Sequence, residues 1–146
     1  MKQMHIDSEV RVGTNDNIPF EQGAFDYLVS WNAMYYMGVP ENHFNIETYV
    51  EEFARVLREG GIVIFSIPMP DHKIYKGADL LDEKYVVIRN DSLNIRNGLV
   101  MRRFMSEIEI AEVFAPFFGN IEFGKLVDDF FGDNDAHWWV GYAIKK

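Results

Sequence analysis

The sequence contains no cysteine among its 146 residues. Disulfide bonds, thiolate metal sites and cysteine nucleophiles are therefore excluded. Long apolar runs are also missing: the longest, around residues 62–69 and 113–118, fall far short of the ~20 residues that a membrane helix needs. Because the N-terminus has no apolar signal core either, we expect a soluble protein of the reducing cytoplasm.

Basic residues are few, with 14 Lys and Arg against 23 Asp and Glu and a formal charge of −9 at pH 7. A surface that neutralises phosphates would have to act against this overall field, so we expect neither nucleic acid nor a membrane as partner. Hydrophobic residues make up 48% of the sequence, which is enough to form a hydrophobic core. No repeat and no Pro-, Gly- or Ser-rich linker divides the chain, so residues 1–146 are expected to form a single domain.

Hydrophobic spacing predicts a strand–helix–strand unit in the first half of the chain. Strands are expected at residues 9–12, 25–30 and 62–67. The residues from Ile46 to Leu57 recur at helical spacing, with Asn45 as the expected N-cap. A helix between two apolar strands indicates a right-handed parallel crossover.

Residues 71–103 follow a different pattern. Two short apolar stretches, 85–88 and 99–101, flank a loop rich in Asn and Asp. This arrangement is typical of an antiparallel excursion, and we interpret residues 71–103 as an inserted arm.

The last third of the chain predicts a helix and then a hairpin. Ser106, followed three residues later by Glu109, is a capping-box signature for the helix. Strands at residues 121–127 and 137–144 fit an antiparallel hairpin around a loop at residues 130–134. Along the chain, the predicted elements therefore form a parallel α/β unit followed by a C-terminal antiparallel hairpin.

Three phrases, read in this order, carry a family resemblance. They are Asn17-Ile18-Pro19-Phe20 with Phe25-Asp26 just downstream, the segment from Glu52 to Gly61 running into a strand, and a late strand ending in Lys145-Lys146. With them the chain resembles the class I S-adenosylmethionine-dependent methyltransferases, in particular the small-molecule subgroup called type 11. The resemblance implies an α/β fold with a truncated Rossmann-like methyltransferase sheet, mostly parallel, with a C-terminal antiparallel hairpin.

The polar turn before Phe20 is the first candidate cofactor site. Its backbone can present amide donors at the mouth of the sheet, while Ile18 supplies an apolar surface for a flat ring. The resemblance places Asn15, Asp16, Asn17 and Ile18 around the adenine of S-adenosylmethionine. For Asp16 and Asn17 a plain role in the turn is the alternative.

The second candidate site follows the strand at residues 25–30. Ligands of open α/β sheets bind at the carboxyl ends of the strands, which is where Ser30, Trp31 and Asn32 lie. The resemblance puts these three residues beside the methionine part of the cofactor, and Tyr35 and Tyr36 near the substrate. Aromatic residues at helical spacing also serve as core, so packing is the alternative for the aromatic side chains.

Among the four histidines, which show no metal-like pairing, His72 alone is placed for catalysis. It follows the strand at residues 62–67, where a general base could deprotonate the methyl acceptor; a structural histidine is the alternative. Arg102 and Arg103 could bind an anionic substrate, but we interpret them as an exposed pair in solvated ion pairs. No metal site is expected.

Family members carry a Gly-x-Gly turn and a ribose-binding acid ahead of these phrases. Only residues 1–12 precede the polar loop here, too few for a unit that takes roughly 30 or more residues. Gly13 is followed by Thr14 and Asn15 and not by a glycine-rich turn. The sequence therefore corresponds to the C-terminal part of a methyltransferase, and we expect its affinity for S-adenosylmethionine to be weak or lost.

Without the strands that accompany the Gly-x-Gly turn in the family, the strand around Leu28 is predicted to have an unpaired apolar edge. Natural proteins pair, cover or charge such edges, so we expect a homodimer or a partner that supplies the missing N-terminal half. The function predicted is S-adenosylmethionine-dependent methylation of a small metabolite, by this chain or by a protein of which it is a truncated remnant. The alternative is a non-catalytic interaction or dimerisation domain. The sequence does not identify the methyl acceptor.

Overall fold

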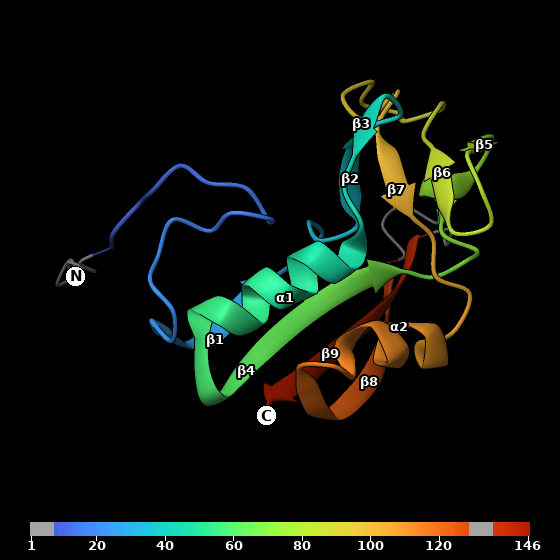
Figure 1. The fold of residues 1–146 in the computed structure, drawn as a ribbon. Coiled ribbons are helices and arrows are strands. Elements are labelled where there is room, and N and C mark those ends of the chain that lie inside the picture. Colours follow the sequence, from blue (N-terminus) through green and yellow to red (C-terminus); the bar gives the residue numbers. More distant parts are fainter. Residues whose placement is uncertain (1–7, 129–135) are drawn as a thin grey trace, which may run out of the picture.

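A computed structural model describes residues 8–128 and 136–146, which form two sheets and two α-helices (Figure 1). Four strands form one sheet, in the order β1-β4-β9-β8. Its strands are β1 (Phe25–Ser30), β4 (Leu57–Pro68), β8 (Phe118–Asp128) and β9 (Ala136–Lys145). The helices are α1 (Ile46–Val56), α2 (Glu107–Phe114) and a 3-10 turn, η1 (Lys73–Tyr75).

A second sheet of five short strands lies beyond the carboxyl end of β4 (Figure 1). Its order is β3-β2-β7-β6-β5. The strands are β2 (Tyr36–Val39), β3 (Asn42–His43), β5 (Asp79–Leu80), β6 (Tyr85–Val87) and β7 (Val100–Arg102). Within residues 71–103 the expected antiparallel pairing is present between β6 and β7. The pairing of β7 with β2, which in turn pairs with β3, was not predicted.

The predicted crossover is confirmed at β1 and β4, which are parallel neighbours with Leu28 opposite Val63. The helix between them, α1, begins at Ile46 as expected. Its apolar spacing buries one face on the sheet, where Val50 and Phe53 are almost fully enclosed.

The sheet is mixed, so the expectation of a mostly parallel sheet is wrong for the described residues. Only β1 and β4 pair in parallel, whereas β9 runs antiparallel to both β4 and β8. The reason lies in the C-terminal hairpin, which provides two of the four strands. Residues 129–135 leave too little chain for a parallel connection, which takes about a dozen residues or more. The loop expected at residues 130–134 lies outside the described residues.

The strand expected at residues 9–12 is also wrong. These residues are irregular and exposed, and the side chain of Val12 is 99% accessible. Alternation alone does not make a strand, because a strand needs a neighbour for its backbone hydrogen bonds. No described strand lies beside this segment.

The capping box predicted for α2 is present. Ser106 Oγ accepts a hydrogen bond of 3.3 Å from the backbone N–H of Glu109. The Glu109 carboxylate in turn accepts from the backbone N–H of Met105 at 3.2 Å. The Glu109 N–H is one of the donors that a helix start leaves unpaired, whereas Met105 lies one residue before the N-cap Ser106. The return bond of the box therefore reaches the residue before the cap, and both bonds come from residues close in sequence.

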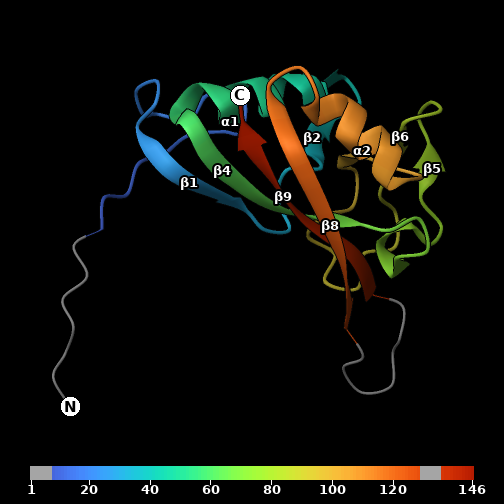
Figure 2. The ribbon, with the colours of Figure 1, turned by 90° about the horizontal axis from the view of Figure 1, so that it is seen from below.

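Both helices lie on one face of the four-stranded sheet, and the opposite face carries no described helix (Figure 2). On the covered face Phe65 of β4 stacks on Phe114 of α2, with ring centroids 4.7 Å apart. The opposite face, called the open face here, holds a shallow groove of about 740 Å³. Its apolar lining comprises Tyr27, Trp31, Ile62, Ile64, Phe123, Val140, Tyr142 and Ile144.

The unpaired edge expected around Leu28 is present among the described residues, because β1 is the outermost strand and pairs with β4 alone. Tyr27 and Val29 on this edge are each 63% exposed. In residues 8–128 and 136–146 there is no helix with the length and apolar character to cross a membrane.

Candidate functional site

The polar turn before Phe20 is held against α1 by two side chains of that helix, Glu52 and Arg55. Glu52 Oε1 accepts a hydrogen bond of 2.7 Å from the backbone N–H of Ile18. Arg55 donates through Nη2 to the carbonyl of Ile18 at 2.8 Å and through Nη1 to the carbonyl of Phe20 at 2.9 Å. We call Glu52 and Arg55 the loop clamp, because together they fix the position of the turn.

The two members of the loop clamp also pair with each other at 2.6 Å, one helical turn apart. The hydrogen bonds from Arg55 and from the Ile18 backbone hold the pKa of Glu52 below its ordinary value, although burial opposes them. The Glu52 side chain is only 12% exposed, so its charge is stabilised mainly by these partners. Both residues lie in the segment from Glu52 to Gly61 that carries the family resemblance, but no role in holding the polar turn was predicted for them. Their three-residue spacing in the predicted helix was the feature that could have indicated their pairing.

The three candidate residues at the carboxyl end of β1, Ser30, Trp31 and Asn32, lie in different surroundings. Ser30 is 5% exposed, and its Oγ has no hydrogen-bond partner among the described residues. Asn32 has a left-handed backbone, with φ of 53°, and exchanges two hydrogen bonds with Ser66 of β4. Its backbone N–H donates to Ser66 Oγ at 2.7 Å, and Ser66 Oγ donates to Asn32 Oδ1 at 2.9 Å. Asn32 thus joins the ends of β1 and β4, while Trp31 lies on the open face.

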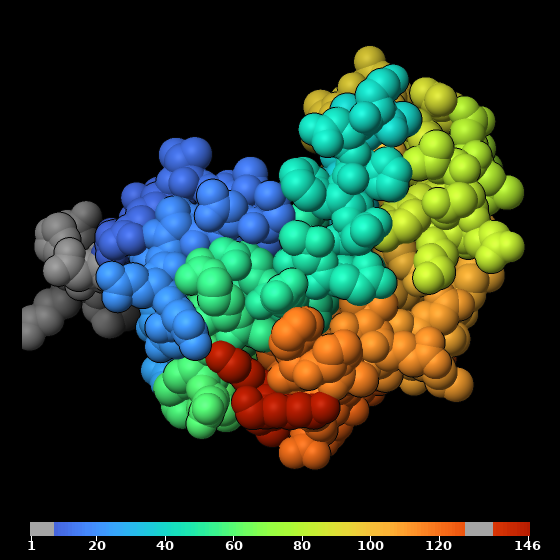
Figure 3. All heavy atoms as spheres, viewed as in Figure 1, coloured from blue at the N-terminus to red at the C-terminus, as the bar shows by residue number. Residues whose placement is uncertain are grey.

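A groove of about 290 Å³ brings the two candidate cofactor segments together. Asn15 and Ile18 line it from the polar turn, and Ser30 lines it from β1. The remaining walls are apolar and include Phe20, Leu28, Ala33 and Phe53. Figure 3 shows a hollow above α1, between the N-terminal segment and the strands β2 and β3. We call the groove of about 290 Å³ that these residues line the β1 groove; Asp16, Asn17, Trp31 and Asn32 are not among its lining residues.

Tyr36 is the first residue of β2, and Tyr35 lies in the turn before it. Their rings are neighbours, with centroids 4.7 Å apart. Tyr35 is buried in the core, and burial raises the pKa of its hydroxyl well above the ordinary value. Tyr36 is only partly buried, and burial raises its pKa against the opposing charge of Arg96. The burial of Tyr35 is consistent with the alternative of core packing, and the charges of Arg96 and Asp91 act on Tyr36 from the arm. A place near the substrate stays a prediction for both residues.

His72 is 7% exposed, in the turn that begins η1. Its Nδ1 accepts a hydrogen bond of 3.0 Å from the backbone N–H of Ile74. In the neutral ring the proton therefore sits on Nε2, which is buried without a partner among the described residues. Burial lowers the pKa of His72 to about 4. At neutral pH this ring offers one N–H donor, and its one lone pair is already engaged.

His72 also lines a cavity of about 440 Å³ between η1 and the loop that connects β6 and β7. We call it the arm pocket; its lining residues are His72, Lys73, Ile74, Lys76, Asn90, Asp91, Ser92 and Arg96. Asp91 accepts from Arg96 Nη1 at 3.0 Å. Burial acts to raise the pKa of Asp91, but backbone N–H donors of Arg96 and Ile95 and the Arg96 charge outweigh it and lower that pKa.

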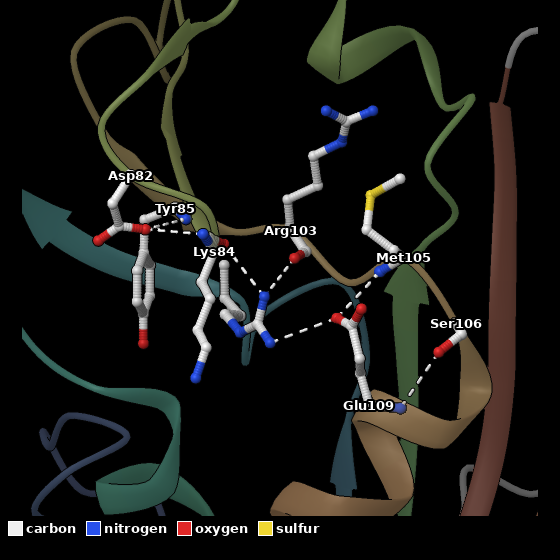
Figure 4. Close-up of polar contacts among 8 residues, drawn as sticks. Asp82, Lys84, Tyr85, Arg103, Met105, Ser106 and Glu109 are labelled. Carbon is white, nitrogen blue, oxygen red and sulfur yellow. Dashed lines mark hydrogen bonds and ion pairs between the residues drawn. The ribbon is translucent and has the colours of Figure 1, made fainter.

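The interpretation of Arg102 and Arg103 as an exposed pair is wrong for Arg102, which is 4% exposed. Its guanidinium donates to the carbonyl of Lys84 at 3.2 Å and to that of Arg103 (Figure 4). It also contacts Glu109 at 3.4 Å and lies over the ring of Phe104. Arg102 therefore ties β6 and β7 to the start of α2. Its burial depends on tertiary packing that a dipeptide of arginines does not reveal.

The N-terminal part of the chain resembles one known protein family in sequence. A family model described as a methyltransferase domain matches residues 2–65. This segment contains the polar turn, β1, the loop clamp and most of β4. No curated protein sequence matches the chain.

Solved structures share the fold over most of the chain. A SAM-dependent methyltransferase from Thermotoga maritima aligns with a TM-score of 0.62 and 17% identity, covering 92% of this chain and 62% of that one. One from Methanosarcina mazei gives a TM-score of 0.65 and 16% identity, covering 99% and 70%. The 1,6-didemethyltoxoflavin-N1-methyltransferase of Burkholderia thailandensis, solved with bound 1,6-didemethyltoxoflavin and S-adenosylhomocysteine, gives 0.60 and 17%, covering 90% and 48%.

Together the family model and the shared fold confirm the expected resemblance to the class I S-adenosylmethionine-dependent methyltransferases. In the Burkholderia enzyme the bound nucleoside is S-adenosylhomocysteine. The chain spans 62% of the length of the Thermotoga protein and 48% of that of the Burkholderia enzyme.

Proposed function

We propose that the chain binds S-adenosylmethionine at the β1 groove and takes part in methyl transfer to a small metabolite. The observation that supports this most directly is the convergence of Asn15, Ile18 and Ser30 on one groove. These residues come from two segments that the sequence marked separately as cofactor sites. The Burkholderia methyltransferase of similar fold was solved with bound 1,6-didemethyltoxoflavin and S-adenosylhomocysteine.

The residues of the β1 groove fit part of this cofactor. Ile18, Phe20 and Phe53 offer apolar surface for a flat base. Ser30 Oγ, which is buried and has no hydrogen-bond partner in residues 8–128 and 136–146, gains a hydrogen bond when a polar ligand atom reaches it. The volume of about 290 Å³ lies at the lower limit of ligand pockets, which span roughly 300–1,000 Å³. We therefore expect the groove to hold one moiety of the cofactor and not all of it.

These contacts indicate what the chain contributes to the reaction and what the cofactor contributes. When bound, S-adenosylmethionine supplies an activated methyl group on a positively charged sulfur. The chain contributes orientation, because the loop clamp fixes the polar turn and the Asn32–Ser66 bonds fix the end of β1. His72 is suited to donate a hydrogen bond and not to remove a proton, since its Nδ1 is engaged. Acceptor deprotonation by His72 is thus not part of the proposal.

Calorimetric titration of the full chain with S-adenosylhomocysteine tests the proposal. We expect saturable binding with a Kd of about 0.1–1 mM, which corresponds to roughly 4–5.5 kcal/mol. Ile18→Glu, which places a charge in the groove, is expected to abolish it. Val12→Glu adds the same charge to an exposed residue of the same segment and serves as control.

Three results would contradict this assignment. One is the absence of saturable binding; another is equal loss in both variants. The third is a folded chain that self-associates and binds no S-adenosylhomocysteine, as a non-catalytic interaction domain would. Circular dichroism of both variants establishes that they remain folded.

A further inference from the structure

The open face of the four-stranded sheet carries apolar side chains that no described helix covers (Figure 2). Ile62 and Ile64 of β4 line its groove together with Val140, Tyr142 and Ile144 of β9. A sheet that presents apolar side chains on a face is stable when another layer packs on that face. A continuous apolar surface of this kind therefore marks an interaction site.

Charge is sparse on the open face although the chain is acidic. Among the described residues that line the groove, only Glu122 carries a formal charge, whereas the whole sequence carries −9. The Glu122 carboxylate accepts a hydrogen bond from the hydroxyl of Tyr142, which raises the pKa of that hydroxyl. A basic partner would thus meet a single carboxylate that is already engaged. The lining favours an apolar partner surface over a charged one.

The relief of the open face is uneven in a way that complements itself. On its β1 side Tyr27 and Trp31 are 63% and 48% exposed, and we call these two side chains the aromatic ridge. On its β8 side Gly124 lines the groove without a side chain, beside Val140. Since β1 and β8 are the outer strands of the sheet, a two-fold axis parallel to the strands places β1 of one copy over β8 of the other. Each aromatic ridge then meets the hollow at Gly124 of the other copy.

The area of the open face is in the range that a dimer needs. Four strands about 4.8 Å apart, over the six residues of β1 at about 3.3 Å each, give a footprint of about 380 Å². Two copies that pack on this face remove about 760 Å² even as flat surfaces, and the relief of ridge and groove adds to this area. Specific interfaces begin near about 1,000–1,200 Å². We therefore expect an interface at the small end of the range, which dissociates on dilution.

We propose that the open face is an interface between two copies of this chain, whose sheets pack about 10 Å apart as in a β-sandwich. The surface is distinct from the β1 edge, because Ile62 and Ile64 lie on β4, which has a neighbouring strand on each side. Tyr27 belongs to both surfaces and does not separate them. The inference stands independently of cofactor binding at the β1 groove.

Sedimentation velocity of the full chain at increasing concentration tests the proposal. We expect the mass to rise from that of one chain to that of two. Ile64→Lys should weaken the dimer about tenfold or more, because it places an unpaired charge in an apolar interface. Ile108→Lys makes the same exchange at a residue that is 70% exposed on α2, away from the open face, and should leave the dimer unchanged. Circular dichroism establishes that both variants remain folded.

Two further measurements use the chain with Ile64 in place. The fluorescence of the half-exposed Trp31 should shift to shorter wavelength as the dimer forms, and Trp31→Phe should remove this shift. Raising the salt concentration from about 0.1 M to about 1 M shortens the screening length from about 10 Å to about 3 Å. The dimer of two acidic chains should therefore tighten, whereas association through opposite charges would loosen.

Four results would overturn the inference. They are a chain that stays monomeric at every concentration, equal weakening of the dimer by Ile64→Lys and Ile108→Lys, a dimer that forms without a shift of the Trp31 fluorescence, and a dimer that loosens with salt. A dimer that folded Ile64→Lys leaves intact would also overturn it, and would indicate contact through the β1 edge instead.

Discussion

Replacing Arg55 with alanine should release the polar turn from α1. The substitution removes the hydrogen bonds to the carbonyls of Ile18 and Phe20, together with the pairing to Glu52. Hydrogen bonds that involve a charged group contribute about 1.5–3 kcal/mol each. Because the Arg55 side chain is 36% exposed, water recovers part of this sum. We therefore expect the turn to be destabilised by about 2–3 kcal/mol relative to the unmodified chain.

Hydrogen exchange of backbone amides measures this quantity locally. The amide of Ile18 donates to Glu52, so it exchanges only when the turn opens. A change of about 2–3 kcal/mol corresponds to a roughly 30- to 150-fold faster exchange. Arg58→Ala is the control, because Arg58 pairs with Asp26 on the exposed surface and should change exchange little. Unchanged exchange at Ile18 in Arg55→Ala, or equal acceleration in Arg58→Ala, would refute the role of the loop clamp.

Further predictions concern acid stability, capping, the covered face and the open edge. The pKa of Glu52 is lowered in the folded chain, so its contribution is complete above the unfolded value of about 4.3 and is lost as pH falls through the folded pKa. The difference in unfolding free energy between the unmodified chain and Glu52→Gln should therefore shrink in urea titrations below that pH, and a constant difference would contradict it. Ser106→Ala should cost about 1 kcal/mol in the same titrations through loss of the cap, whereas the cap-preserving Ser106→Thr should cost little. Phe114→Ala should cost about 3–5 kcal/mol because it removes a buried ring that stacks on Phe65; a loss below 1 kcal/mol would show that this contact is absent. Tyr27→Lys should lower the native mass if β1 edges pair between copies; a chain that is monomeric at all concentrations would exclude that pairing.

Local patterns predicted the elements whose burial follows from their own sequence. The periodic residues of α1 and the capping box of α2 need only nearby residues to specify a helix. The β-branched run of β4 and the two strands of the hairpin were found for the same reason. By contrast, residues 9–12 alternate in the same way but have no described neighbour, and the pattern carries no information on pairing.

The second sheet was missed because its strands are short and their partners are distant in sequence. Tyr36 of β2 lies opposite Met101 of β7, a pairing that neither segment indicates alone. No strand was predicted at residues 36–39, where the positive φ of Gly38 and the following turn allow the chain to reverse.

The candidate cofactor site was predictable in part. Asn15, Ile18 and Ser30 meet at the β1 groove, as two motifs in the correct order suggested. Trp31 diverges from Ser30 because successive residues of an extended chain point to opposite sides. Asn32 diverges because its backbone is left-handed, with φ of 53°, and its side chain is bonded to Ser66. The role of His72 could not be anticipated, since the hydrogen bond from Ile74 and the burial of Nε2 are properties of the folded turn.

The outer edge of β1 has a consequence for how the molecule behaves among other polypeptides. Its backbone groups on that side have no partner among the described strands, so an extended peptide of any origin can dock there by main-chain bonding. We therefore expect the concentration of such peptides, and not only temperature or denaturant, to affect how much of the protein is free.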